Sequence, residues 1–455
     1  MTGAVAVLDI GKTNVKLALF ARDGALLWTR SAPNRVAPAP PYPHADVEAI
    51  EAFLVDALRE ARHVAPIDLI APTTHGCAGA LVDDGGLVLP VMDYEFTGVD
   101  EIEPSYAPLR PPFAETYSPP LSRGLNLGRQ IAWQKRNFPA KFARARFYLT
   151  YPQYWAWRLS GIAAAEVTML GAHSDLWNPL RGEPSRLASA LGVLSLLPPL
   201  RRAYERLGPL KAEIARAAGL GDDVGVLCGI HDSNASLLPH LASRKPPFTI
   251  VSTGTWVILM AVGLGLDHLD PTDDTLANVD VEGRPVACAR FMGGREYSQI
   301  VGDAADNCDA DALQRAIAAR AMALPCFSGQ GGPFPSRKGE IRGAVAPGDR
   351  PALARLYLAA MTDLMLTRLG ARTGDLIVEG SLAADPLACG LIAALRPSQP
   401  LYAAADSAGT ARGAALLAQW PPRGFQPPPL KSVDPVKIAG LDAWRAAWTQ
   451  AVLAG

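Results

Sequence analysis

Residues 5–20 read Val-Ala-Val-Leu-Asp-Ile-Gly-Lys-Thr-Asn-Val-Lys-Leu-Ala-Leu-Phe, and this stretch decides the fold of the chain. Two apolar runs, Val5–Leu8 and Val15–Phe20, are rich in β-forming residues and are separated by a short polar turn. This pattern is typical of a hairpin between two buried strands. We therefore expect the first element of the fold to be a β-hairpin inside a sheet.

The turn of this hairpin carries groups that suit a metal-bound polyphosphate. Asp9 supplies a carboxylate, and Gly11 lets backbone amides come close to a ligand. Thr13 and Asn14 can hydrogen-bond phosphate oxygens, and Lys16 adds a positive charge. An ordinary structural turn has a similar composition, so the rest of the chain has to decide between the two interpretations.

The composition indicates an ordinary globular protein. Its 455 residues exceed what one hydrophobic core usually supports, so we expect two domains. The 43 Lys and Arg residues nearly balance the 44 Asp and Glu residues. The sequence has no basic stripe interleaved with aromatic residues, so we do not expect a nucleic-acid partner. Six cysteines are scattered without a CxxC pair, which argues against structural zinc and favours a reducing compartment.

The sequence contains neither a basic-then-apolar leader nor an uninterrupted apolar run near 18 residues. We therefore expect neither secretion nor a membrane span, and a cytoplasmic location is the default. A homodimer is the default expectation for the oligomeric state, because cyclic dimers are the commonest soluble assemblies.

Polar residues follow two predicted strands in the first half. Ile67–Pro72 is a short apolar strand, and Thr-Thr-His75-Gly76 comes directly after it. Leu87–Met92 is another predicted strand, and Asp93 follows it. Ligand-binding groups of open α/β sheets lie at the carboxyl ends of strands, so these positions suit substrate chemistry. A histidine with a purely structural role is the alternative for His75.

Asp232 occupies a similar position later in the chain. The predicted strand Val224–Cys228 runs into Gly-Ile-His-Asp232, and a helix is predicted over Asn234–Leu241. A carboxylate at such a turn is exposed to a cleft. The alternative is that Asp232 only caps the helix that follows it.

The second half opens as the first half does. Phe248–Val251 and Trp256–Val262 are apolar β-runs that flank Ser252-Thr-Gly-Thr255. The order of strand, small polar turn and strand therefore occurs twice. It predicts two similar domains, each offering a phosphate-binding hairpin.

A third polar turn follows the predicted strand Leu376–Val378. Glu379-Gly380-Ser381 leads into a helix with Asp385 as N-cap and proline at its first position. A strand, a glycine turn and a helix form a nucleotide site in many folds, although the same order is common without a ligand.

Other helices follow from periodicity and capping. Asp46 caps an amphipathic helix to about His63, and two further helices are predicted over Ala312–Ala323 and Pro351–Leu369. The segment 100–180 is rich in tryptophan and tyrosine, and we expect most of these aromatic residues in the core.

With these pieces in order, the sequence resembles the FGGY carbohydrate kinases, a branch of the sugar kinase, Hsp70 and actin superfamily. The resemblance spans nearly the whole chain and rests on five motifs in the family's order. They are the first phosphate motif at Asp9–Lys16, the catalytic motif at Gly229–Asp232, the second phosphate motif at Ser252–Thr255, the adenosine motif at Glu379–Ser381 and the closing glycine-alanine helix at Gly409–Ala415.

The resemblance implies an α/β fold of two ribonuclease H-like, actin-like ATPase domains, with mixed sheets flanked by helices and a catalytic cleft between the domains. Residues 1–245 are expected to bind the sugar and to carry the first phosphate motif and the catalytic aspartate. Residues 246–455 are expected to bind the nucleotide.

The resemblance also implies roles for individual residues. Asp232 is expected to be the general base, and Asp9 to hold Mg²⁺ together with the phosphates of ATP. The expected contacts to ATP and its phosphates come from Gly11, Thr13, Asn14, Lys16, Thr253, Gly254, Thr255, Gly380 and Ser381. We interpret Lys12 as a solvated charge.

For the acceptor, the residues His75, Gly76, Asp93 and Asp232 are expected to bind the sugar. The sequence Thr-His75-Gly76 is similar to the sugar-pocket motif of ketose kinases such as the xylulokinases, so a ketose or a polyol is the expected acceptor. The competing hypothesis is an ATP-binding sensor or switch protein of the same superfamily without kinase activity. A switch needs neither a sugar-side base nor a sugar pocket.

Overall fold

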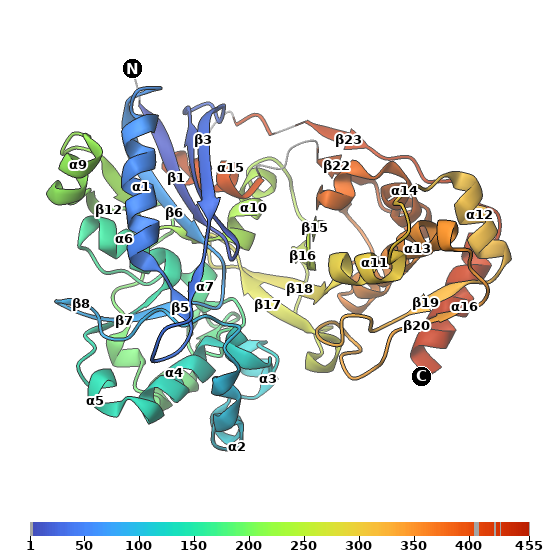
Figure 1. Ribbon diagram of the computed structural model, residues 1–455, viewed down its shortest axis with the longest axis horizontal. Coiled ribbons are helices and arrows are strands. Elements are labelled where there is room, and N and C mark those ends of the chain that lie inside the picture. The colour runs from blue at the N-terminus through green and yellow to red at the C-terminus, as the bar shows by residue number, and fades with distance from the viewer. Residues whose placement is uncertain (1–2, 405–408, 423–424, 428, 455) are drawn as a thin grey trace. The chain divides into compact units, whose positions relative to one another are not determined.

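The computed structural model describes residues 3–404, 409–422, 425–427 and 429–454, and it divides into two compact units (Figure 1). The first unit comprises Met1–Ser243, Ala277–Pro285 and Ala408–Pro427. The second unit comprises the remaining three segments, Arg244–Leu276, Val286–Ser407 and Pro428–Gly455. Two segments of the second half thus belong to the first unit, whereas the sequence placed them in a domain of residues 246–455.

The first unit is built on a seven-stranded mixed sheet in the order β12-β13-β6-β1-β2-β3, with β14 also paired to β6. Its strands are β1 (Ala4–Ile10), β2 (Asn14–Phe20), β3 (Leu26–Pro33), β6 (Ile67–Thr74), β12 (Arg206–Pro209), β13 (Gly225–Leu227) and β14 (Ile230–His231). The hairpin β1–β2 is antiparallel, and β6 is parallel to β1. The predicted opening hairpin is therefore confirmed.

Both faces of β1 are buried, as expected for a strand in the middle of an α/β layer, whereas the edge strand β3 is largely exposed. The residues of β1 alternate between two hydrophobic clusters, with Ala4, Ala6, Leu8 and Ile10 in one and Val5 and Val7 in the other. The first cluster includes residues of α1 (Val47–Ala61), α6 (Tyr151–Ser160) and α9 (Ala212–Ala218). The second cluster includes residues of α10 (Asp232–Leu241) and α15 (Gly409–Leu416).

The remaining elements of the first unit are short. Its other helices are α2 (Glu103–Tyr106), α3 (Phe113–Thr116), α4 (Leu127–Asn137), α5 (Pro139–Phe142), α7 (Val167–Leu170) and α8 (Arg186–Ala190). Three small sheets pair β4 (Val36–Ala37) with β5 (His44–Ala45), β7 (Gly79–Asp83) with β8 (Gly86–Leu87) and β9 (Phe147–Thr150), and β10 (Trp177–Asn178) with β11 (Glu183–Pro184). Most aromatic residues of this region lie in the core, as predicted.

The other seven-stranded mixed sheet has the order β17-β18-β16-β15-β21-β22-β23, and it lies in the second unit except where β17 ends and β18 begins, within the segment Ala277–Pro285. Its strands are β15 (Phe248–Thr253), β16 (Val257–Val262), β17 (Thr275–Val279), β18 (Pro285–Phe291), β21 (Asp375–Gly380), β22 (Leu401–Ala404) and β23 (Leu430–Ser432). The hairpin β15–β16 is antiparallel and β21 is parallel to β15, which repeats the arrangement of β1, β2 and β6.

The helices of the second unit are α11 (Gly293–Val301), α12 (Ala310–Ala318), α13 (Arg350–Arg368), α14 (Pro386–Leu395) and α16 (Leu441–Ala454). A two-stranded sheet pairs β19 (Met322–Leu324) with β20 (Glu340–Arg342). Each unit therefore has a mixed sheet with helices, which confirms the predicted fold class.

Two predicted elements differ from the structure. The strand expected over Leu87–Met92 is reduced to β8, which ends at Leu87, because Pro90 has no N–H to give to a ladder. The helix expected over Ala312–Ala323 begins earlier, at Ala310 after the N-cap Asp309, and ends at Ala318. The last residues of the predicted helix belong to β19 instead.

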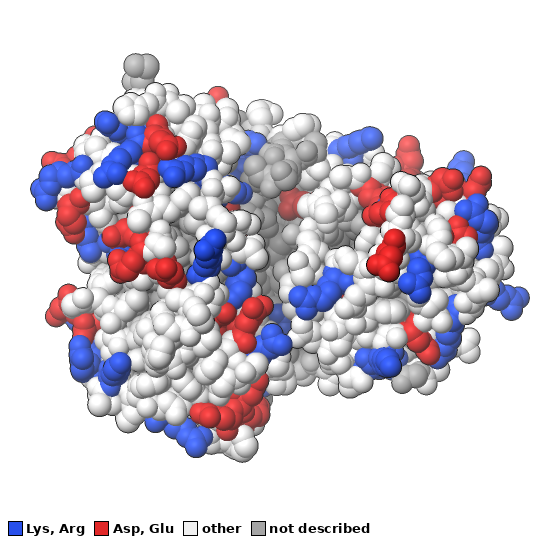
Figure 2. Space-filling model, viewed as in Figure 1, with Lys and Arg blue, Asp and Glu red and all other residues white. Residues whose placement is uncertain are grey.

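Acidic and basic side chains are interspersed on the face of the molecule that Figure 2 shows. Within the described ranges, none of the helices has both the length and the apolar character that crossing a membrane requires.

Candidate active site

Three strands of the first unit bring the predicted site residues to one edge of its sheet. In the parallel pair of β1 and β6, Asp9 lies opposite Thr73, and in the parallel pair of β14 and β6, His231 lies opposite Thr74. His75 and Asp232 are the next residues after these pairs. The register therefore gathers Asp9, His75 and Asp232 at the carboxyl ends of neighbouring strands.

Asp9 is a largely buried carboxylate with one cation beside it. Its side chain is 14% exposed, and Nζ of Lys16, directly across the hairpin, lies 3.7 Å from Oδ2. The pKa of Asp9 is raised to about 6, because burial raises it more than Lys16 lowers it and the charge of Asp232 adds to the rise. A carboxylate with so little compensation suits a site where a cation joins it.

Asp232 begins α10 and is held by the backbone that follows it. Its Oδ1 accepts hydrogen bonds from the amide and the hydroxyl of Ser233 at 2.6 and 3.2 Å. Burial raises the pKa of this carboxyl group, and the neighbouring His75 and the bonds from Ser233 lower it. The side chain remains 29% exposed, so a ligand can reach it.

His75 faces the same edge. Its Nδ1 lies 2.8 Å from the carbonyl oxygen of Gly76, and its ring packs 5.5 Å from Tyr94 and 5.4 Å from Tyr151 between ring centres. Burial lowers the pKa of His75, whereas the bond to Gly76 and the charge of Asp232 raise it. A neutral imidazole here can hydrogen-bond a hydroxyl group.

Asp93 forms an ion pair with Lys12, and Glu95 lies 3.5 Å from the same ammonium group. Lys12 also lies 4.8 Å from the ring centre of Tyr94. The interpretation of Lys12 as a solvated charge is therefore wrong, because this lysine holds Asp93, whose side chain is 10% exposed. The pair lies beside His75, and both residues act on its pKa.

The turn residues differ in what surrounds them. Thr13 and Asn14 are exposed and hydrogen-bond each other, and the amide of Gly11 donates to the carbonyl oxygen of Asn14 at 2.9 Å. Gly76 is a close approach within the protein, because a Cβ atom there would lie 2.7 Å from Nε2 of His231.

Two buried residues that the sequence did not single out are His231, which directly precedes Asp232, and Glu166. Burial lowers the pKa of His231 to about 4, so its ring is neutral at pH 7. The amide of His231 donates to Oγ1 of Thr168 at 3.1 Å, and that hydroxyl donates to Glu166 at 2.5 Å. The position of His231 beside Asp232 in the sequence was a usable indication, whereas nothing local marks Glu166.

In the second unit, Thr253 ties two strand ends together. Its Oγ1 donates to the carbonyl oxygen of Glu379 at 2.5 Å and accepts from the amide of Leu382 at 2.9 Å. Gly380 has a φ of 79°, and a Cβ atom there would lie 1.9 Å from the carbonyl oxygen of Thr253. Only glycine fits this position, so the two predicted motifs meet.

A cavity of about 580 Å³, here called the turn cavity, opens beside this junction. Its lining includes four predicted residues, Thr253, Gly254, Thr255 and Ser381. The lining also includes residues that the sequence analysis did not assign to a nucleotide, namely Gly294, Arg295, Tyr297, Ser298, Asp306 and Asp385. A Cβ atom at Gly294 would lie 2.1 Å from the carbonyl oxygen of Gly254, which brings α11 against the turn.

The donor groups of the described residues limit how a metal ion could bind. Among the residues that the structure describes, no group of three or more His, Cys, Asp or Glu side chains could hold a metal ion. Asp9 therefore fits a magnesium ion only when phosphate oxygens and water supply the other ligands, which is how Mg²⁺ is commonly bound beside nucleotides.

Two stretches of the sequence match one protein family. Residues 123–239 match the N-terminal domain of the FGGY family of carbohydrate kinases, and residues 245–427 match the C-terminal domain of carbohydrate kinase FGGY.

Curated relatives align over part of their length. L-fuculokinase of Escherichia coli strain K12 is 28% identical over 275 residues, which cover 58% of this chain and 57% of that protein. L-fuculokinase of Salmonella typhi is 28% identical over 268 residues, 56% of each. The chain thus spans little more than half the length of these curated relatives.

Solved structures align over nearly the whole chain. A xylulose kinase from Lactobacillus acidophilus has a TM-score of 0.82 at 14% identity, covering 99% of this chain and 96% of that one, and it shows a shared fold. A carbohydrate kinase from Novosphingobium aromaticivorans has a TM-score of 0.91 at 35% identity, covering 100% of this chain and 99% of that one. The chain belongs to the FGGY family of carbohydrate kinases.

Proposed function

We propose that this chain is an ATP-dependent carbohydrate kinase that transfers the γ-phosphate of ATP to a hydroxyl group of a ketose or a polyol. The observation that carries the proposal is the convergence of Asp9, His75 and Asp232 at one edge of the first unit's sheet. Phosphoryl transfer needs alignment, charge neutralisation and a base, and these residues offer all three.

Asp232 is the proposed general base. It is reachable by a ligand, it is fixed by Ser233, and burial raises its pKa above the usual value for a carboxyl group. A carboxylate so placed can accept the hydroxyl proton as the new bond to phosphorus forms. Groups of this kind contribute about 10²–10⁴-fold to the rate.

Asp9 is the proposed magnesium ligand, and Gly11, Thr13, Asn14 and Lys16 are the proposed phosphate contacts of the first hairpin. Mg²⁺, when bound, neutralises charge on the polyphosphate. The raised pKa of Asp9 supports this role, because a cation would favour the ionised form of the carboxyl group.

His75, Gly76, Asp93 and Asp232 are proposed to bind the acceptor sugar. Lys12 holds Asp93 in place, which leaves a fixed carboxylate for hydroxyl groups. The names of relatives, L-fuculokinase and xylulose kinase, favour a ketose.

The turn cavity of the second unit is proposed to bind ATP. Thr253, Gly254 and Thr255 are proposed to contact its phosphates, and Gly380 and Ser381 its adenosine. Residues 1–245 are thus proposed to serve the acceptor and 246–455 the nucleotide. We also propose a cytoplasmic homodimer without nucleic-acid or membrane partners, and the scattered cysteines, which form no CxxC pair, support the reducing compartment.

A screen for ADP release over ketoses and polyols, with ATP and Mg²⁺, tests this proposal. The change Asp232→Asn should lower kcat about 10²–10⁴-fold with the accepted sugar. It should leave the affinity for ADP unchanged, which calorimetry can measure, because Asp232 lies outside the turn cavity. The control Asp222→Asn changes an exposed aspartate ten residues away and should keep full activity.

Two results would contradict the kinase proposal. Full activity of Asp232→Asn would remove Asp232 as the base. If no acceptor releases ADP while ATP raises the thermal midpoint, the ATP-binding sensor is the better description.

A further inference from the structure

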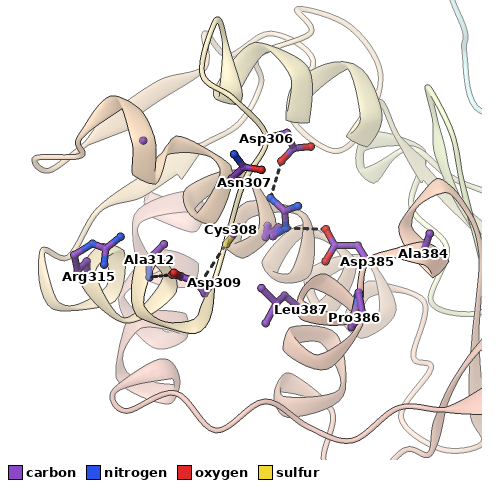
Figure 3. Close-up of a pocket in the computed structure, with 12 residues that line it drawn as sticks. Asp306, Asn307, Cys308, Asp309, Ala312, Arg315, Ala384, Asp385, Pro386 and Leu387 are labelled. Carbon is purple, nitrogen blue, oxygen red and sulfur yellow. Dashed lines mark hydrogen bonds and ion pairs between the residues drawn. The ribbon is translucent and has the colours of Figure 1, made fainter.

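The turn cavity adjoins a second cavity of about 650 Å³ in the same unit, here called the Arg355 cavity (Figure 3). The two cavities share two lining residues, Asp306 and Asp385. The Arg355 cavity is further lined by the N-terminal ends of α12 and α14. The two cavities therefore border the same two carboxylates, and each has a volume in the range of small-molecule binding sites.

Arg355 is a buried cation between the two shared carboxylates. The residue is 8% exposed, its Nε donates to Oδ2 of Asp385 at 2.7 Å, and its Nη1 donates to Oδ1 of Asp306 at 2.9 Å. The dashed lines that reach Asp306 and Asp385 in Figure 3 mark these bonds. Nη1 also donates to the carbonyl oxygen of Pro351, whereas Nη2 has no hydrogen-bond partner in the described ranges.

Asp306 is fixed through only one of its oxygens. Its Oδ1 accepts from Arg355 and from the hydroxyl group of Tyr297 at 2.6 Å, and the Arg355 guanidinium lies 5.6 Å from the centre of the Tyr297 ring. Oδ2 of Asp306 has no partner among the residues that the structure describes, and the side chain is 53% exposed. Burial raises the pKa of Asp306, but the bonds from Tyr297 and Arg355 outweigh it and hold the pKa below its usual value.

The polarity of the two cavities orients a nucleotide. The hydroxyl group of Thr255 and the charge of Arg295 line the turn cavity alone, and both suit phosphate. The carboxylates of Asp306 and Asp385 line the shared part, where a phosphate group would be repelled. The helix N-termini do not offer an alternative anion site, because Asp309 and Asp385 already cap them. The base is the part of a nucleotide that fits beside the carboxylates.

We infer that Asp306 is a specificity-determining residue for the nucleotide, and that its Oδ2 accepts a hydrogen bond from an exocyclic amino group of the base. The inference rests on the proposed function, because that function makes a nucleotide the phosphate donor. Tyr297, Arg355 and Asp385 act as positioning residues that fix the orientation of Asp306. The site therefore favours adenine over a purine that lacks the amino group.

Calorimetric titration of the full chain with ADP and with purine riboside 5′-diphosphate tests the inference. The two ligands differ only in the amino group at C6. The wild-type chain should bind ADP at least about tenfold more tightly, since hydrogen bonds to charged groups are worth this much or more.

The change Asp306→Asn turns the free oxygen into an N–H donor but keeps an oxygen for Tyr297 and Arg355. The preference for ADP should fall to about twofold or less, and the affinity for IDP, which carries an oxygen at C6, should improve relative to ADP. Asp303→Asn, an exposed change in the same loop and outside both cavities, should behave as wild type. Thermal midpoints report whether each variant is folded.

Equal affinities of the wild-type chain for the two diphosphates would overturn the inference without any variant, as would an unchanged preference in Asp306→Asn. The outcome is separable from that of the kinase proposal. A preference for ADP without sugar-dependent ADP release supports the inference and contradicts the kinase proposal, whereas sugar-dependent ADP release without the preference does the reverse.

Discussion

Glu166 is a fully buried carboxyl group that reaches the site through two hydrogen bonds. Its Oε2 accepts from the amide and the hydroxyl of Thr168, and that hydroxyl in turn accepts from the amide of His231. Its other oxygen has no hydrogen-bond partner in the described structure. Burial raises the pKa of Glu166 from 4.5 to about 7, and the bonds from Thr168 lower it only in part.

This raised pKa predicts a loss of stability as pH rises. The folded state binds the proton of Glu166 more tightly than the unfolded state does. The contribution of Glu166 to the stability of the fold is therefore complete below about pH 4.5 and is lost between pH 4.5 and about 7. Between pH 5 and 8, the thermal midpoint of the wild-type chain should therefore fall further than that of Glu166→Gln. The difference corresponds to about 3 kcal/mol at most, from a shift of about 2.5 pKa units.

The stability that the neutral His231 contributes has the opposite pH dependence, since its pKa is lowered and the contribution is lost as pH falls from about 6.5 to 4. It is present in both proteins and cancels in the comparison. Glu183→Gln, a change at an exposed carboxylate, should follow the wild-type curve. Parallel curves for wild type and Glu166→Gln would show that Glu166 does not titrate in this range.

Residue chemistry could be predicted from the sequence where the groups are close along the chain. The turn residues Asp9 and Lys16 are seven residues apart and face each other in the hairpin, as the strand pattern required. Lys12 was misjudged because its partner Asp93 is 81 residues away. Glu166 was missed for the same reason, since a residue that is buried by remote parts of the chain leaves no local pattern in the sequence.

At the scale of elements, helices α10 and α15 pack with almost no space between them. A Cβ atom at Gly413 would lie 1.8 Å from the backbone carbonyl oxygen of Ala235. Because α10 begins with Asp232, this contact also supports the proposed base. The small residues of the closing helix therefore have a structural reason.

The change Gly413→Ala should destabilise the protein. Alanine is normally better than glycine in a helix by about 1 kcal/mol, but backbone atoms cannot yield to an added methyl group as a side chain can. We expect a net loss of about 1–3 kcal/mol in the free energy of unfolding, measured by urea denaturation. Gly348→Ala, where nothing lies within 4 Å of the added atom, should be nearly neutral. A stabilised Gly413→Ala variant would contradict the close approach.

Element type was predictable wherever a local rule acts. Asp46, Asp309 and Asp385 cap the helices that follow them, and proline begins α14 as its fixed φ favours. The lengths of strands were less predictable, because pairing with neighbouring strands decides where each strand ends. β6 continues past Pro72 to Thr74 since β1 and β14 pair with it there.

At the scale of the whole molecule, the two-domain expectation follows from chain length and from the repeated hairpin. Which segments of the chain belong to which unit cannot be predicted in this way, because that assignment depends on contacts between residues far apart in the sequence. Val279, from the segment Ala277–Pro285, joins a core cluster of the first unit, and Ala411 and Ala414 pack with Val5. No pattern within these short apolar segments tells which of two cores they complete.

The assignment of nucleotide and acceptor to separate units predicts how amide hydrogen exchange should respond to each ligand. ADP should slow exchange in the second unit, at β15, β16 and the start of α11, which surround the turn cavity. At 100 times its Kd, a ligand stabilises its site by about 2.7 kcal/mol, so exchange there can slow up to about 100-fold.

An acceptor sugar found by the ADP-release screen should instead slow exchange in the first unit, near His75, Asp93 and the start of α10. The helix α9, whose residues line neither cavity, serves as the internal control. Protection by ADP that is confined to the first unit would reverse the assignment, because the turn cavity would then not be where the nucleotide binds.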